Sequence, residues 1–357
     1  MNTFFLDRLN SEPHALAFAG QSTPWPVALA DQSANPALDE ALHTHAAAAQ
    51  ALLYPVSAEL LATTGRPVDL FGFEPNPARL GAAAAASASV PGIALTQLGA
   101  LLDAAALGYN PAQAKPVAVL GHSQGVLAVH MVQAICEAGS IDAAAAKIDE
   151  ILAIATLIGV AGTRQARQLG LAARHGEATP MLSVKDITRA QVDALIERVD
   201  GARGPIAVAV TNSATHYVLS GYPEDLAAFG VEVAKEHKRQ AKLREEKVRG
   251  GRVFDPTLEY LDVTLPFHSP LMADAVSQAV AWAEACGINA DHARELAAEV
   301  LLNHVDWAAR VRALMKSTDP SALWVLDFGP GNTVGKLFST VAQGTGVGVV
   351  EASTVAD

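Results

Sequence analysis

The chain has 357 residues, of which 50 % are hydrophobic and 17 % are charged. This content supports a sizeable core with room for two subdomains, and the net charge of −12 argues against nucleic-acid binding through bulk charge. Cys136 and Cys286 lie in apolar helical contexts without metal-ligand spacing, so we expect two buried thiols and no metal site. The N-terminus lacks a signal-peptide pattern and no apolar run reaches membrane-spanning length, which predicts a cytoplasmic protein that does not enter a membrane.

The first part of the chain predicts strands and helices in alternation. Residues 15–19 form an apolar run that predicts a buried strand, and the loop Gly20-Gln21 follows it. The alanine-rich segment 35–61 predicts helices. Pro91-Gly92 is expected to open a helix that runs to Leu107, because proline suits the first helical turn. A further long helix is predicted over 148–171.

The segment Gly121-His122-Ser123-Gln124-Gly125 stands between an apolar run at 116–120 and a predicted helix over 126–132. A strand, G-x-S-x-G and a helix together are the pattern of a nucleophile elbow. The turn is too tight for side chains at its flanking positions, which accounts for the two glycines. Ser123 would then stand at the strand tip beside the positive end of the helix, where a serine can attack a carbonyl group. A plain strand–helix turn is the simpler alternative.

The pattern changes after Gly176. Strands are predicted at 181–184, 206–210, 217–220 and 257–265, with helices at 188–199 and 223–236. This β-α-β-β-α-β order is ferredoxin-like, and its place between the elbow and the later motifs predicts an inserted subdomain over 177–265. Residues 235–252 are rich in basic side chains. They are either a solvated helix and loop or a landing site for an anionic partner.

The α/β pattern returns after Pro266, with a buried strand predicted at 324–328 and a turn at 329–332. The glycines of that turn either shape the strand–helix junction or cradle a phosphate. Ser123 needs a general base. Among the histidines, His268 stands where the chain leaves the inserted subdomain, so it is expected to face the cleft between the two parts. His216 and His304 are the next candidates.

Four motifs together resemble the acyl-CoA:acyl carrier protein transacylases: Gly20-Gln21, residues 121–125, Phe267-His268-Ser269 and residues 328–331. The G-H-S-Q-G form, residues 157–160 and residues 249–254 are similar to the N-terminal acetyltransferase domain of actinobacterial and fungal type I fatty acid synthases. The resemblance implies an α/β-hydrolase-like core, over 1–176 and 266–357, with the ferredoxin-like insertion at 177–265. It makes Ser123 the nucleophile and His268 the base.

The resemblance also implies the rest of the site. The backbone N–H groups of Gln21 and Gln124 would form the oxyanion hole. Ile158 stands where malonyl-transferring members carry an arginine that pairs with the malonyl carboxylate, and an apolar residue cannot offset the desolvation of that group. Arg164 and Arg167 lie six and nine positions further along, on other faces of the helix. Val300 takes the place of a glutamine whose backbone carbonyl orients the catalytic histidine in the family.

His122 and Asn212 complete the expected substrate-binding residues. The expected reaction moves an acetyl group from acetyl-CoA to the phosphopantetheine thiol of an acyl carrier protein through a Ser123 ester, without a permanently bound cofactor. The other domains of a type I fatty acid synthase are the expected partners. A malonyl or palmitoyl transferase of the same family and a serine esterase or thioesterase are the alternatives. Against a hydrolase, α/β-hydrolases place their histidine near the chain end, whereas a further strand follows His268.

Overall fold

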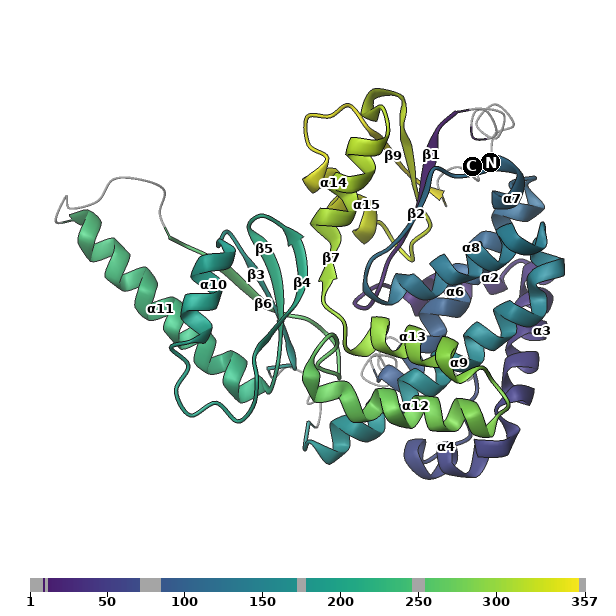
Figure 1. Cartoon of the computed structure of the whole chain (residues 1–357), viewed down its shortest axis with the longest axis horizontal. Helices are drawn as coiled ribbons and strands as arrows, with labels where there is room; N and C mark the ends of the chain where they lie inside the picture. Colours follow the sequence, from purple (N-terminus) through teal and green to yellow (C-terminus); the bar gives the residue numbers. More distant parts are fainter. Residues whose placement is uncertain (1–8, 10–11, 71–84, 172–177, 246–253, 353–357) are drawn as a thin grey trace.

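The computed structural model of the chain describes residues 9, 12–70, 85–171, 178–245 and 254–352. Figure 1 shows two bodies, with the helix-rich core on the right and the inserted sheet and its two helices on the left. The core is built on a four-stranded parallel sheet, in the order β2 (Ala118–Gly121), β1 (His14–Phe18), β8 (Trp324–Asp327) and β9 (Gly348–Glu351). Every residue of β1 is buried, as expected of a strand inside a parallel sheet.

Helices enclose this sheet, and α8 packs on β1 and β2 while α15 packs on β1, β8 and β9. The helices of the core are α2 (Trp25–Ser33), α3 (Pro36–Leu52), α4 (Ser57–Thr64), α6 (Ala86–Ala106), α7 (Pro111–Ala114), α8 (Val126–Ala138), α9 (Ile141–Gln168), α12 (Ala273–Ala285), α13 (Ala290–Leu301), α14 (Trp307–Ser317) and α15 (Thr333–Val341). Short 3₁₀ turns add η1 (Tyr54–Val56), η3 (Ser123–Gly125), η4 (Pro270–Met272) and η5 (Pro320–Ala322).

Two helices begin earlier than predicted. Helix α6 begins at Ala86, so Pro91 lies inside it rather than at its start. Burial of nearly the whole of α6 outweighs the one backbone hydrogen bond that Pro91 cannot donate. Helix α9 begins at Ile141, where the Ser140 side chain caps it by accepting from the N–H of Ala143.

The inserted subdomain has the predicted ferredoxin-like order. It consists of β3 (Met181–Lys185), α10 (Arg189–Ile196), β4 (Ala207–Ser213), β5 (His216–Ser220), α11 (Pro223–Glu245) and β6 (Thr257–Tyr260). The strands lie in the order β6-β3-β5-β4, and β3 and β4 are antiparallel to β5, as β6 is to β3. Helix α11 is longer and β6 shorter than the sequence predicts.

A fifth strand, β7 (Val305–Asp306), joins this sheet from outside the predicted bounds of 177–265, by pairing parallel to β4. The sheet also has two different faces. Leu219 packs in a separate cluster with the helices of the subdomain, whereas its neighbour Val218 belongs to the main core. Alternation along a strand therefore ties one face of the inserted sheet to the core.

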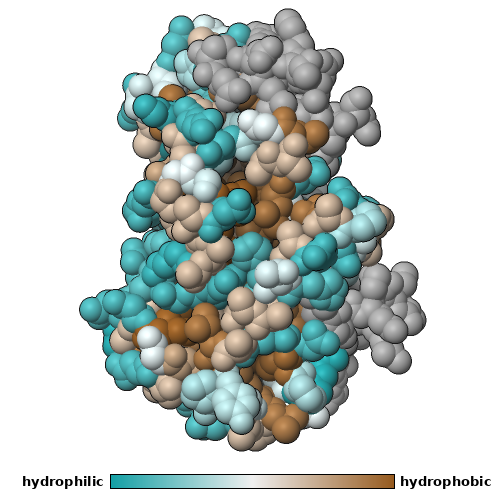
Figure 2. Space-filling model, turned by 90° about the vertical axis from the view of Figure 1, so that its right-hand side faces the viewer, coloured by the Kyte–Doolittle hydropathy of each residue, from teal (hydrophilic) through white to brown (hydrophobic). Residues whose placement is uncertain are grey.

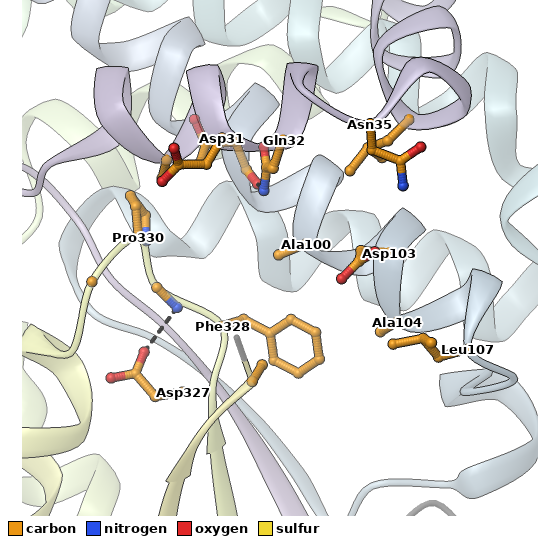
Figure 3. Close-up of a pocket in the computed structure, with 16 residues that line it drawn as sticks. Asp31, Gln32, Asn35, Ala100, Asp103, Ala104, Leu107, Asp327, Phe328 and Pro330 are labelled. Atoms are coloured by element: carbon orange, nitrogen blue, oxygen red, sulfur yellow. Dashed lines mark hydrogen bonds between the residues drawn. The ribbon is translucent and has the colours of Figure 1, made fainter. Parts of the chain in front are cut away.

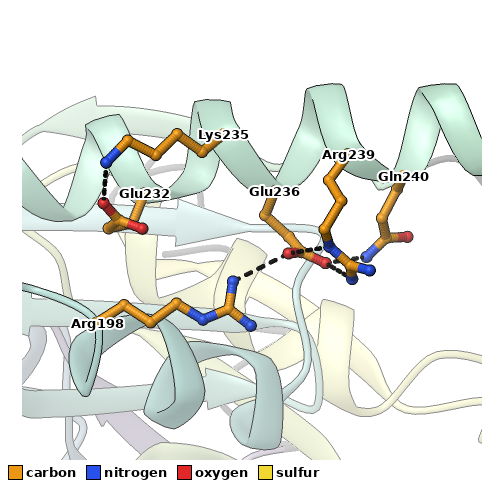
Figure 4. Close-up of polar contacts among 6 residues, drawn as sticks. All are labelled: Arg198, Glu232, Lys235, Glu236, Arg239 and Gln240. Atoms are coloured by element: carbon orange, nitrogen blue, oxygen red, sulfur yellow. Dashed lines mark hydrogen bonds and ion pairs between the residues drawn. The ribbon is translucent and has the colours of Figure 1, made fainter.

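Helix α11 is held to the subdomain by a buried carboxylate (Figure 4). Glu236 is 7 % exposed and accepts hydrogen bonds from Arg239, Arg198 and Gln240. The hydrogen bonds from Arg239, followed by those from the other partners, hold the pKa of Glu236 at about 2 against the opposing effect of burial. Lys235 likewise pairs with Glu232. Some cations of the basic stretch are thus paired within α11, and residues 246–252 of that stretch lie outside the described part.

The prediction of two buried thiols is wrong. Cys136 is exposed and Cys286 is half-buried. Cys136 is exposed because it lies on the outer side of α8, which packs on the sheet through its other residues.

Among the described residues, one helix, α6, is long and apolar enough to cross a membrane. In this structure 78 % of its most apolar window is buried inside the protein. On the face drawn in Figure 2, hydrophobic side chains form separate patches among hydrophilic ones.

Candidate active site

The elbow forms at the end of β2 as the glycine spacing predicts. Ser123 has a φ of +55°, a strained conformation for a residue with a side chain. A Cβ on Gly121 would stand 2.4 Å from the N of Val126, and one on Gly125 would stand 2.2 Å from the O of Phe18. Both neighbours are backbone atoms that cannot yield. The two glycines therefore let the chain turn tightly enough to present Ser123 at the strand tip.

Ser123 meets His268, which lies 145 positions further along the chain. The distance from Ser123 Oγ to His268 Nε2 is 2.6 Å, and His268 Nδ1 lies 2.8 Å from the carbonyl oxygen of Asn303. A carbonyl oxygen can only accept a hydrogen bond, so Nδ1 of His268 carries the hydrogen and donates a hydrogen bond to the carbonyl of Asn303. The lone pair of Nε2 then faces the serine hydroxyl, as a general base requires.

The carbonyl that orients His268 belongs to Asn303, three residues after Val300, which takes the place of the family's glutamine. Val300 is fully buried in the last turn of α13. The chain leaves the helix after Leu301, whose carbonyl accepts from the N–H of Ser269, and Asn303 follows with its carbonyl turned to the imidazole. Carbonyls beyond a helix end have no intrahelical partner, which makes this segment suited to the task.

Burial keeps His268 neutral. The side chain is 2 % exposed, and desolvation, aided by the nearby His122, His304 and Arg310, lowers its pKa to about 3 against the hydrogen bond to Asn303. The imidazole is therefore a free base at neutral pH. Arg310 also donates from Nη1 to the carbonyl of Gly121 at 2.9 Å, which fixes the start of the elbow.

The other candidate bases are engaged elsewhere. His216 Nε2 lies 3.0 Å from Ser183 Oγ, and burial lowers the pKa of His216 to about 4. His304 Nε2 lies 3.0 Å from Thr211 Oγ1. His268 is therefore the histidine that the fold brings to Ser123.

His122 and Asn212, expected to contact substrate, contact each other. His122 Nε2 lies 2.8 Å from Asn212 Oδ1, and the His122 ring packs edge-on against Trp307. The amide nitrogen of Asn212 lies 3.4 Å from His216 Nε2. Both ends of the Asn212 amide thus have protein partners.

The loop after β1 lies directly against the elbow. A Cβ on Gly20 would stand 2.7 Å from the O of His122 and 3.3 Å from the N of Gln124. The Gln21 side chain donates from Nε2 to Gln124 Oε1, and Gln124 donates from Nε2 to the carbonyl of Val90 at 2.6 Å. The side chains are thus turned to each other and to α6, while the backbones of the two loops run close together beside Ser123.

Ile158 is fully buried on α9. One turn later, a Cβ on Gly162 would stand 2.4 Å from the Leu265 side chain, so this face of α9 packs on the segment that leads to His268. The two later arginines point elsewhere. Arg164 donates to Gln278 at 2.8 Å, and Arg167 donates to the carbonyl of Thr63.

A separate pocket of about 360 Å³ opens at the carboxyl ends of β8 and β9 (Figure 3). Neither Ser123 nor His268 lines it. Its lining among the described residues includes the carboxylates of Asp31, Asp103 and Asp327 and no Lys or Arg. Asp327 accepts from the N–H groups of Gly329 and Gly335 at 2.8 Å each. The turn at 329–331 therefore shapes the strand–helix junction, and the acidic lining disfavours a phosphate.

No group of three or more His, Cys, Asp or Glu side chains is placed to hold a metal ion in the described part of the chain. The site thus consists of a serine, a neutral histidine, an orienting carbonyl and two adjacent backbone loops. This arrangement can form and break an ester on Ser123.

Residues 180–260 match the family described as the fatty acid synthase central AT domain. The chain is 27 % identical over 308 residues to the fatty acid synthase beta subunit TOXC of Cochliobolus carbonum, covering 74 % of this chain. It is 25 % identical over 301 residues to the fatty acid synthase subunit beta of Saccharomyces cerevisiae, covering 75 % of this chain. The matched part is 14 % of the length of each relative.

Solved structures show the same fold. The malonyl-CoA:acyl carrier protein transacylase of Xanthomonas oryzae has a TM-score of 0.63 at 17 % identity, with 97 % of this chain and 96 % of that chain covered. MCAT from Mycobacterium tuberculosis has a TM-score of 0.61 at 19 % identity, with 96 % and 99 % covered. The predicted fold class, a hydrolase-like α/β core with a ferredoxin-like insertion, is confirmed.

Proposed function

We propose that this chain, a member of the acyltransferase family related to the acyltransferase domains of fatty acid synthases, moves an acyl group from coenzyme A to an acyl carrier protein through an ester on Ser123. The observation that carries the proposal is the 2.6 Å contact between Ser123 Oγ at the elbow and the neutral His268 Nε2. We retain residues 177–265 as the proposed inserted subdomain.

The proposed reaction has two half-reactions. Ser123 Oγ attacks the thioester carbonyl carbon while His268 Nε2 takes the hydroxyl proton. The backbone N–H groups of Gln21 and Gln124 stabilise the oxyanion, which collapses to the Ser123 ester and expels the CoA thiolate, and His268 returns the proton to that sulfur. The phosphopantetheine thiol then attacks the ester carbonyl while His268 takes the thiol proton. The bond from the acyl carbon to Ser123 Oγ breaks, and His268 returns the proton to Oγ, which regenerates Ser123.

Acetyl, or another acyl group without a terminal carboxylate, is the proposed substrate. The fully buried Ile158 supports this preference, because the same face of α9 packs on the segment before His268 and the two nearby arginines bond to Gln278 and Thr63. A malonyl carboxylate beside Ile158 would be desolvated without a partner. The solved transacylases with the same fold are described as malonyl enzymes, which makes the acyl group the first property to test.

The proposed partners are an acyl carrier protein domain and the other domains of a type I fatty acid synthase. The matched relatives are fatty acid synthase subunits, and one transacylase with this fold was solved in complex with an acyl-carrier protein. A cytoplasmic location agrees with the CoA esters that the reaction needs.

Labelled acetyl-CoA tests the proposal directly. After incubation, the labelled peptide is identified by mass spectrometry, and Ser123→Ala is the control. Label confined to Ser123 that moves to added pantetheine or carrier protein faster than it is lost to water is the expected result. Label on another residue would contradict the mechanism. Rapid loss to water without transfer would instead indicate an esterase or thioesterase.

A further inference from the structure

Strand β4 of the inserted sheet contacts the residue that precedes the proposed nucleophile Ser123. His122 precedes Ser123 in the elbow, and its Nε2 lies 2.8 Å from Oδ1 of Asn212 on β4. The contact joins residues 90 positions apart. Since His122 is half-buried and its ring also packs on Trp307, it can shift little without moving Ser123.

The same strand reaches the segment that orients the base. His304 follows Asn303, whose carbonyl accepts from His268, and Nε2 of His304 lies 3.0 Å from Oγ1 of Thr211. The backbone reinforces this link, because Thr211 pairs with Asp306 in the parallel β4–β7 contact. One position on β4 therefore holds the chain that carries the orienting carbonyl.

Adjacent residues of a regular strand point to opposite faces. The pairing of β4 with β5 shifts register between Thr211 and Ser213, and Asn212 falls inside that irregularity. A bulge re-aims a side chain beside an active site. The irregularity at Asn212 explains how Thr211 and Asn212, which are consecutive, can each bond to a different part of the site.

We infer that Thr211 and Asn212 are positioning residues, a two-point clamp by which the inserted subdomain sets the distance between Ser123 and His268. Asn212 holds the nucleophile side, and Thr211 holds the base side. The inference rests on the proposed function, since it assigns these residues to the same dyad. It also departs from the expectation that Asn212 binds substrate, because both ends of its amide already contact His122 and His216.

The test compares Thr211→Val and Asn212→Ala with the matched control Ser213→Ala, whose hydroxyl accepts from the N–H of Thr215 in the same hairpin. Two rates are measured for each variant. Labelling of Ser123 by a fluorophosphonate probe reports nucleophile activation without any acyl donor. Loading from acetyl-CoA gives kcat and KM separately, and melting curves verify folding.

Each clamp variant should label Ser123 about 10- to 100-fold more slowly, because a displacement near 1 Å costs this much. Its kcat should fall in parallel while KM for acetyl-CoA stays within about twofold. Asn212→Asp keeps the Oδ1 acceptor and should recover most of the rate. The double variant should lose less than the product of the single losses, since both act on one distance. Ser213→Ala should match the wild type.

Unchanged probe labelling in folded Thr211→Val and Asn212→Ala would overturn the clamp. A rise in KM alone would overturn it too, and would return Asn212 to substrate binding. If Asn212→Ala does not fold, Thr211→Val, which keeps the side-chain shape, decides the question. A wild-type protein that reacts with the probe but accepts no acyl-CoA would contradict the proposed function while leaving the clamp intact.

Discussion

The proposed preference for acetyl over malonyl groups rests on the surroundings of Ile158. The side chain is fully buried, its neighbours Leu157 and Val160 are buried and apolar, and Arg164 and Arg167 donate elsewhere. In the proposed acyl site, an acetyl methyl beside Ile158 would leave no polar group unpaired. A malonyl carboxylate would lose its hydration and gain no cation, which costs several kcal/mol for a fully buried charge.

Partial hydration of the carboxylate reduces this penalty. We therefore expect the activation free energies for loading malonyl-CoA and acetyl-CoA to differ by about 2–4 kcal/mol. This difference corresponds to about 30- to 1000-fold in kcat/KM in favour of acetyl-CoA. The assay mixes differently labelled acetyl-CoA and malonyl-CoA and measures the two Ser123 esters by mass spectrometry. Ile158→Leu keeps volume and polarity and should keep the ratio. Ile158→Arg should narrow or reverse it.

Equal loading, or a malonyl preference in the wild type, would refute the argument from Ile158. Another cation would then have to serve the carboxylate. Arg310 is the first to test, because it bonds to the elbow at Gly121 and lowers the pKa of His268. In that case Arg310→Leu should reduce malonyl loading and spare acetyl loading.

Three further outcomes are expected. His268→Ala should slow loading of Ser123 about 10²- to 10⁴-fold with KM little changed, and a near-normal rate would show that another group is the base. Gly125→Ala should destabilise the fold by about 3 kcal/mol, because the added Cβ would meet the Phe18 carbonyl. Gly230→Ala is the control and should not destabilise the fold, because its Cβ would make an ordinary contact at 3.6 Å. Urea unfolding of both variants measures the difference in the free energy of unfolding. The pKa values of His268 and His216, about 3 and about 4, lie below their ordinary 6.5. As the pH falls from 6.5, the histidines of the unfolded chain therefore bind protons before those of the folded protein, so these two groups should lower the melting temperature between pH 6.5 and 4. The rate of Ser123 loading should show no acid limb near pH 6.5, because His268 stays neutral there. A melting temperature that rises on acidification would contradict this sign.

Local sequence determined the elbow and the order of elements. The glycines at 121 and 125 and the apolar runs on either side specify a strand, a tight turn and a helix, because the reasons are steric and lie within a few residues. The sequence likewise predicted the ferredoxin-like order of strands and helices, and in the structure Thr188 caps α10 at the start of the predicted helix. His268 was found through its place between two predicted units and through the family resemblance.

Tertiary structure alone decided how the dyad is held. The carbonyl of Asn303, the parallel pairing of β7 with β4, and the contacts of Thr211 and Asn212 join segments that are far apart in the chain. The sequence left the orienting carbonyl open, because the residues after Val300 decide where α13 ends and which carbonyl turns to the imidazole. Periodicity and spacing describe neighbours along the chain, whereas these contacts depend on how the inserted sheet packs against the core, which no local pattern encodes.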